Sequence, residues 1–64
     1  MAASFEVYKD KIGEFHWRLV HTNGQIIAHS GNGYTTKVNT IHGINSVKDN
    51  ISCAVIKDNS VLNF

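Results

Sequence analysis

Apolar and polar residues alternate along three stretches in the first half of the chain, and a period of two residues is typical of half-buried β-strands. These stretches are residues 5–9, 15–21 and 25–29. Asn23 and Gly24 lie between the second and the third, and Asn-Gly in this setting predicts a hairpin closed by a two-residue type I′ turn. The pairs that follow are His21 with Ile26, Val20 with Ile27, Leu19 with Ala28, and Arg18 with His29.

This hairpin separates an apolar face from a mixed one, because residues that pair across two strands share a face of the sheet. The apolar face, expected to lie against the core, carries Phe15, Trp17, Leu19, Ile26 and Ala28. The mixed face carries His16, Arg18, Val20, Gln25, Ile27 and His29. An uncovered face with exposed apolar residues can be a contact surface. The candidate interaction face is therefore Tyr8, His16, Arg18, Val20, Ile27 and His29.

The loop between the first two strands decides their register. A two-residue loop of Ile12 and Gly13 would place Phe5 and Val7 on the mixed face. A three-residue loop of residues 11–13, with Gly13 in the left-handed conformation, gives different partners. These are Val7 with Trp17, Phe5 with Leu19, and Glu6 with Arg18. We favour the longer loop, because it unites the apolar residues and pairs opposite charges.

A helix is predicted over residues 36–49, where apolar residues recur every third position. They are Val38, Ile41, Ile44 and Val47. Three residues fall about 60° short of a full helical turn, so this stripe is wide but stays on one side. Either Thr35 or Thr36 can cap the first turn. Gly43 allows a close contact with the sheet or is simply tolerated.

Residues 53–57 have the pattern of a fourth strand, and residues 61–64 form a short apolar tail. The predicted strand consists of Cys53, Ala54, Val55, Ile56 and Lys57. The order β-β-β-α-β predicts an α+β fold, in which one helix covers the Trp17 face of an antiparallel sheet. Proline is absent and no linker divides the sequence, so we expect a single domain over residues 1–64.

Size and composition favour an oligomer. A protein of 64 residues buries only about 60% of the surface that its unfolded form exposes, and such domains commonly depend on disulfides, metal or association. The one cysteine cannot form an intrachain disulfide, and no Cys/His cluster has the spacing of a structural zinc site. Association is the remaining source of stability.

A net charge of +1 disfavours nucleic acid or an acidic membrane as an obligatory partner. The sequence has no apolar run near the roughly 18 residues of a membrane helix and no signal-peptide pattern at its start. A single thiol fits a reducing compartment. We therefore expect a cytoplasmic protein without a membrane partner.

The loop of residues 31–37 is the candidate ligand site. It places glycines and Lys37 at the start of the predicted helix, where free N–H groups can hold an anion. The candidate residues are Gly31, Gly33, Thr35, Thr36 and Lys37. The spacing does not match the nucleotide-binding P-loop. An ordinary strand-to-helix turn is the alternative interpretation.

The sequence shows no catalytic constellation. His16 and His29 share the mixed face, but Arg18 lies opposite His29 and its charge opposes a metal ion there. Cys53 lacks the base and the oxyanion donors that a nucleophile requires, so we expect a structural thiol in a sheet or near a dimer seam. The expectation is a protein without metal, cofactor or enzymatic activity.

With these residues placed, the sequence resembles the YegP-like family of small bacterial and archaeal proteins. The likeness extends from about residue 5 to residue 57. It lies in residues 5–10, 13–14, 17–19, 23–28, 30–31, 33–37, 43–44 and 46–48. Two positions depart from the family pattern: His16, where a basic or polar residue is common, and His29, where an acidic one is common.

The resemblance implies a β(3)-α-β unit used twice, either in tandem or as two subunits, with one continuous sheet and exchanged C-terminal strands. For this single-unit protein it implies a homodimer with residues 53–57 in the partner's sheet. It implies no established activity and no catalytic residues. We therefore expect a non-enzymatic binding or interaction module. The alternatives are a binder of a small anion at residues 31–37, and weak single-stranded nucleic-acid binding through Arg18, Lys9 and Tyr8.

Overall fold

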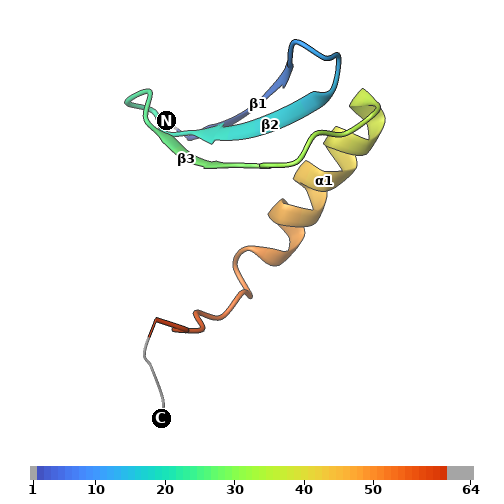
Figure 1. Cartoon of the computed structure of the whole chain (residues 1–64). Coiled ribbons are helices and arrows are strands. Elements are labelled where there is room, and N and C mark those ends of the chain that lie inside the picture. The colour runs from blue at the N-terminus through green and yellow to red at the C-terminus, as the bar shows by residue number, and fades with distance from the viewer. Residues whose placement is uncertain (1, 61–64) are drawn as a thin grey trace.

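The computed structural model describes residues 2–60, and the apolar tail of residues 61–64 lies outside them. Three strands and one helix follow one another in sequence (Figure 1). They are β1 (Ser4–Lys9), β2 (Phe15–Val20), β3 (Ile26–His29) and α1 (Lys37–Asn50). The strands form an antiparallel sheet in the order β1-β2-β3, and α1 lies against β1 and β2. The predicted α+β class is confirmed.

The register of β1 on β2 is the one predicted from the three-residue loop. Phe5 pairs with Leu19, Glu6 with Arg18, and Val7 with Trp17. Gly13 has a φ of 89°, so it adopts the left-handed conformation that the loop requires. Its N–H donates to the Asp10 carbonyl at 3.1 Å, and the Asp10 N–H donates to the Glu14 carbonyl at 2.8 Å. These two bonds close the hairpin.

The turn between β2 and β3 is not the predicted type I′ turn. Only Gly24, with a φ of 91°, has a positive φ there, whereas a type I′ turn needs two such residues. The Gly24 N–H donates to the His21 carbonyl, and the His21 N–H donates to that of Gln25, each at 2.8 Å. The loop therefore has three residues and repeats the geometry of the first hairpin. A non-glycine residue resists positive φ, which favours this arrangement.

The longer loop changes the pairing beside it. Val20 pairs with Ile26 instead of Ile27, and a bulge at this point restores the predicted pairs Leu19 with Ala28 and Arg18 with His29. Ile26 consequently shares the face of Val20 and is 53% exposed, so its predicted core position is wrong. Ile27, the extra residue in β3, offsets the extra residue in the loop. Beyond this bulge the strand residues therefore lie on the faces of the sheet that were predicted.

After β3 the backbone returns to the sheet at Tyr34. Tyr34 and Phe15 exchange two backbone hydrogen bonds of 2.8 Å. Ser30 lies between the end of β3 and Tyr34. Its N–H donates to the Trp17 carbonyl, and its hydroxyl accepts from the Trp17 N–H at 3.3 Å. The side chain of Ser30 thus replaces a backbone acceptor where the strand breaks off. These hydrogen bonds attach the backbone to the sheet just before α1 begins.

Thr36 caps α1, since its hydroxyl accepts the Asn39 N–H at 3.1 Å. The helix buries Thr40 and Ile44, and Val38 is 63% exposed. The predicted stripe is therefore wrong in its first half. Positions 40, 44 and 47 keep within one face of a helix of 3.6 residues per turn, whereas position 38 lies on the opposite side. Thr40 is buried because its hydroxyl donates to the Thr36 carbonyl within the helix.

The core of the described residues is small. Trp17 and Ile44, each 7% exposed, are the only buried hydrophobic residues within residues 2–60. The Phe5 ring meets Trp17 edge-on, with ring centroids 5.4 Å apart. The Trp17 Nε1–H is buried without an acceptor among these residues, which costs about 1–3 kcal/mol. The described residues therefore bury little hydrophobic surface that would stabilise the fold.

Residues 53–57 form no strand in the described part of the molecule. The helix ends in turns, in which the Cys53 N–H donates to the Asn50 carbonyl, and the backbone then runs away from the sheet (Figure 1). Every residue of the segment is exposed, including Cys53, for which a buried place was expected. The predicted fourth strand is thus not formed among residues 2–60, because the segment pairs with none of the strands β1 to β3, and its exchange with a partner remains a prediction.

Candidate functional site

The outer face of the sheet, opposite α1, is the candidate site. It is built by Glu6 and Tyr8 of β1, His16, Arg18 and Val20 of β2, and Ile26 and His29 of β3, as their pairings show. Alternation along each strand sends Phe5, Val7 and Trp17 to the helix and their neighbours to this face. Five of the six predicted interaction residues pair on this face, and the sixth, Ile27, is the extra residue of the bulge.

Three side chains of the outer face are stacked in a row. The rings of Tyr8 and His16 lie 5.3 Å apart between centroids, at an interplanar angle of 14°. The Arg18 guanidinium carbon lies 4.9 Å from the centre of the Tyr8 ring. A cation over an aromatic face is attracted by the ring quadrupole. The Tyr8 ring thus contacts both His16 and Arg18, and both of these side chains carry hydrogen-bond donors.

A carboxylate anchors each end of this row. The Arg18 Nε donates to Glu6 Oε1 at 2.8 Å, and His16 Nε2 lies 2.6 Å from Asp10 Oδ2. Asp10 also closes the turn, since its Oδ1 accepts the N–H groups of Ile12 and Glu14 at 3.0 and 2.9 Å. The hydrogen bond to His16, followed by that from Glu14, holds the pKa of Asp10 below its ordinary value of 3.8.

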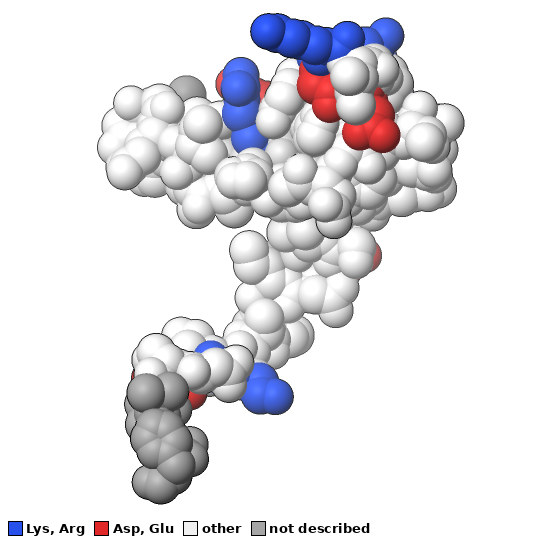
Figure 2. Space-filling view, viewed as in Figure 1, with Lys and Arg blue, Asp and Glu red and all other residues white. Residues whose placement is uncertain are grey.

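Opposite charges lie side by side on this part of the molecule. Figure 2 shows blue and red atoms together over the sheet, whereas the helix below it is largely white in the same view. The ion pair of Arg18 with Glu6, whose Nε and Oε1 lie 2.8 Å apart, accounts for part of this mixture. The surface is polar and balanced in charge, unlike the basic groove that a nucleic-acid backbone requires.

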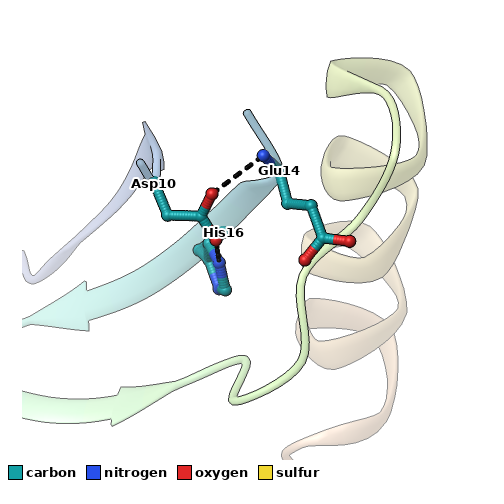
Figure 3. A group of neighbouring side chains, drawn as sticks. All are labelled: Asp10, Glu14 and His16. Carbon is teal, nitrogen blue, oxygen red and sulfur yellow. Dashed lines mark hydrogen bonds and ion pairs between the residues drawn. The ribbon is translucent and has the colours of Figure 1, made fainter. Parts of the chain in front are cut away.

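Asp10, Glu14 and His16 each offer one ligand atom, and these atoms lie within 4.8 Å of one another. Figure 3 shows Asp10 and His16 directed toward each other and the Glu14 carboxylate turned toward the loop before α1. An imidazole nitrogen and carboxylate oxygens are donors that zinc and similar cations accept. A cation would have to displace the 2.6 Å contact between Asp10 and His16. The absence of a metal remains a prediction.

The partners of His16 were missed from the sequence. Asp10 and Glu14 were both assigned only to the first turn. A signal existed, because Asp at the first position of a type I turn followed by Gly at the fourth is a favoured combination. An Asp held in that way has one oxygen free, and a strand residue six positions later can reach it.

The loop of residues 31–37 uses several of its own donors. The N–H groups of Gly31, Asn32 and Tyr34 donate to His29 Nδ1, the Ser30 carbonyl and the Phe15 carbonyl, respectively. Thr36 is occupied as the helix cap, while Lys37, the only cationic residue of the loop, is exposed. The loop has the geometry of the strand-to-helix turn that was the alternative interpretation. Anion binding there remains a prediction.

Known proteins resemble this chain over most of its length. Residues 10–58 match the family described as a domain of unknown function, DUF1508. The protein belongs to this family. A UPF0339 protein of Neisseria meningitidis is 43% identical over 84% of the present sequence and 95% of its own. A UPF0339 protein of Methanosarcina acetivorans is 50% identical over 75% of the present sequence and 81% of its own. The resemblance to the YegP-like family is thus confirmed, and these family names describe no enzymatic activity.

Two further comparisons concern the extent of the family unit. The solution structure of a Haloferax volcanii protein has a TM-score of 0.83 and 46% identity, covering 89% of the present protein and 95% of that one. In Stutzerimonas stutzeri, a UPF0339 protein in the ptx operon 5′ region is 48% identical over 78% of the present sequence but only 44% of its own length. More than half of that UPF0339 protein therefore lies outside the match. No helix among residues 2–60 of the present protein is long and apolar enough to cross a membrane.

Proposed function

We propose that this protein is a homodimeric interaction module without enzymatic activity, in which residues 53–57 of each copy extend the sheet of the other. The observation that carries the proposal is the exposure of this segment. Val55 is 80% exposed and Ile56 97%, and no strand within residues 2–60 pairs with them. β-Branched residues in an extended segment are suited to a sheet edge, where backbone groups are free to pair.

The accessible area of the protein supports an oligomer. One copy, of 7.1 kDa, exposes 5347 Å². A compact monomer of that mass exposes about 4,100 Å² by the usual scaling with mass. The excess of about 1,200 Å² exceeds the roughly 800 Å² that each partner contributes to a standard interface. A second copy can cover this area and supply the core that one copy lacks.

Length variation in the family is consistent with two units. The Stutzerimonas stutzeri relative matches the present protein over less than half of its own length. A longer protein can hold two units in tandem, whereas a single unit needs a second copy to reach the same assembly. This comparison supports the proposal through size alone.

The outer face is the surface that such a dimer would offer to a further partner. Its stacked Tyr8 and His16, the Arg18 guanidinium above Tyr8, and the exposed Ile26 combine apolar area with fixed polar groups. Aromatic residues and Arg are enriched in protein interfaces, because they add contact area and directed hydrogen bonds. A protein partner fits this surface better than a nucleic acid. The single exposed thiol, Cys53, supports a reducing, cytoplasmic setting.

The dimer can be tested with two matched substitutions. Ile56→Asp places a charge in the proposed exchanged strand, and Ile12→Asp makes the same change at the tip of the first hairpin, where Ile12 is 80% exposed. Native mass spectrometry and sedimentation should show a dimer for the wild type and for Ile12→Asp. Ile56→Asp should shift the population toward monomer. A wild-type monomer at micromolar concentration, or a dimer unaffected by Ile56→Asp, would contradict the proposal.

A further inference from the structure

Two Asn-Gly pairs occur in the protein, Asn23-Gly24 and Asn32-Gly33, and both asparagines are exposed. Asn-Gly is chemically labile because glycine has no side chain to hinder attack by its own backbone nitrogen on the preceding amide. That nitrogen forms a bond to the asparagine Cγ, the bond between Cγ and Nδ2 breaks, and ammonia leaves. Water then opens the cyclic imide at either carbonyl, which gives aspartate or isoaspartate.

At Asn23 both reacting groups are held by hydrogen bonds. The Asn23 Oδ1 accepts the Gln25 N–H at 2.9 Å, and the Gly24 N–H donates to the His21 carbonyl at 2.8 Å. The attacking nitrogen is thus turned toward the hairpin, and the amide that it must reach is directed elsewhere. Both bonds have to break before the ring can close, and together they lower the rate by about tenfold or more.

At Asn32 these restraints are missing from the described part of the molecule. Neither the Asn32 side-chain amide nor the Gly33 N–H makes a hydrogen bond within residues 2–60, although the Asn32 backbone is held on both sides by Ser30. The two pairs have the same residue types and both asparagines are exposed, although Gly24 is exposed and Gly33 only partly so. The pairs therefore differ mainly in how the reacting atoms are held by hydrogen bonds.

Glycine is required at position 33 for a packing reason. A Cβ built on Gly33 would lie 2.8 Å from the Cβ of Glu14, which is closer than real carbon atoms approach. The Glu14 side chain extends toward this loop (Figure 3). The packing therefore requires glycine at position 33, directly after Asn32, and glycine is the residue that hinders ring closure least.

The geometry points to Asn32 as the site of spontaneous deamidation in the folded protein, with Asn23 protected by its turn. The step needs only solvent water and base, and it releases one ammonia for each residue converted. Its isoaspartate product adds one methylene to the backbone two residues before Tyr34, whose two hydrogen bonds to Phe15 attach the loop to the sheet. This modification does not depend on the proposed dimer.

One peptide reports on both sites. Trypsin cleaves after Arg18 and Lys37 and releases residues 19–37, which contain both Asn-Gly pairs. The native protein is incubated at mildly alkaline pH, and tandem mass spectrometry of this peptide then measures conversion at each asparagine. A synthetic peptide of residues 19–37 provides the unfolded reference. In the peptide the two rates should agree within about twofold, whereas in the protein Asn32 should react about tenfold faster than Asn23, since two bonds protect the latter.

Two variants control the assignment. Asn32→Gln should remove most of the ammonia released by the native protein, because glutamine cyclises much more slowly, and Asn23→Gln should leave the release nearly unchanged. Equal rates at the two sites in the folded protein, or faster conversion at Asn23, would overturn the inference. A tenfold difference that persists in the synthetic peptide would also overturn it, because the preference would then come from the local sequence and not from the fold.

Discussion

The Tyr8 ring lies parallel to that of His16, and the two are directly opposite each other on β1 and β2, with centroids 5.3 Å apart. His16 in turn contacts Asp10 at the end of β1. His16 therefore pairs with Tyr8 across the strands, stacks on its ring and contacts the carboxylate that closes the first turn. This arrangement connects the conformation of the first hairpin to the outer face of the sheet.

The stacked pair should contribute measurably to stability. In a double-mutant cycle with Tyr8→Ala and His16→Ala, we expect a coupling of about 0.5–1 kcal/mol in the free energy of unfolding. The matched cycle of Tyr8→Ala with His42→Ala should be additive within about 0.5 kcal/mol, because His42 lies on the helix. All measurements need one protein concentration, because the proposed dimerisation would shift the apparent stability. Additive effects for Tyr8 and His16 would contradict a stabilising stack.

Asp10 should make stability fall in acid. Its pKa is lowered in the folded protein, so its stabilising contribution is fully present above its unfolded pKa and is lost as the pH falls through the lowered folded value. Asp10→Asn should therefore weaken the protein near neutral pH and flatten the pH dependence below about pH 4. Urea unfolding midpoints across this range measure both effects. A variant that retains the full wild-type acid dependence would show that other carboxylates are responsible.

Gly43→Ala should destabilise the fold although alanine is the better helix former by about 1 kcal/mol. An added Cβ would lie 2.5 Å from the Tyr34 hydroxyl oxygen and 3.0 Å from its Cζ. We expect a net cost of about 1–2 kcal/mol, because the Tyr34 backbone is fixed to Phe15 and the ring has little room to retreat. In a Tyr34→Leu background the same change should be neutral or stabilising. Chemical denaturation of the wild type, the two single variants and the double variant measures how the cost of Gly43→Ala depends on Tyr34. An equal loss of stability in both backgrounds would contradict a clash with the Tyr34 ring.

The inward face of α1 can be identified with one pair of truncations. Ile44→Ala should cost about 2–5 kcal/mol, as expected for a buried aliphatic side chain. Val38→Ala, at a site that is 63% exposed, should stay within about 0.5 kcal/mol. Comparable losses at the two positions would place both in a buried contact and would favour the stripe predicted from the sequence.

The sequence predicted the first hairpin well because several constraints agreed there. Gly13 fitted the left-handed position, Glu6 and Arg18 paired, and Trp17 came to lie opposite Val7. The second turn was predicted less well, because Asn23-Gly24 is compatible with either loop length. The bulge at β3 then compensated for the longer loop, and such compensation is invisible in a local pattern.

The helix was predicted correctly and Thr36, one of the two candidate caps, is the cap, but only the second half of the predicted inner face is right. A regular series of aliphatic residues suggested a stripe, whereas the buried set contains Thr40, a polar residue whose hydroxyl is satisfied inside the helix. For the candidate site, the faces of Tyr8, His16 and Arg18 were predictable from alternation. Their stacking and the contact with Asp10 depend on side-chain conformations, which spacing does not determine.

The hydrogen bonds between Tyr34 and Phe15 fix the N-terminal end of α1 to the sheet, so a tilt of the helix moves its C-terminal end the most. The sheet holds the backbone just before the first turn, and the buried contacts of the helix end at its third turn, near Val47. A helix of 14 residues is about 21 Å long, so a rotation of about 10° at its start moves its far end by nearly 4 Å. A Cβ added at Gly43 would press on the Tyr34 ring, and any tilt of α1 that relieved this contact would displace residues 51–60 more than the residues beside Gly43.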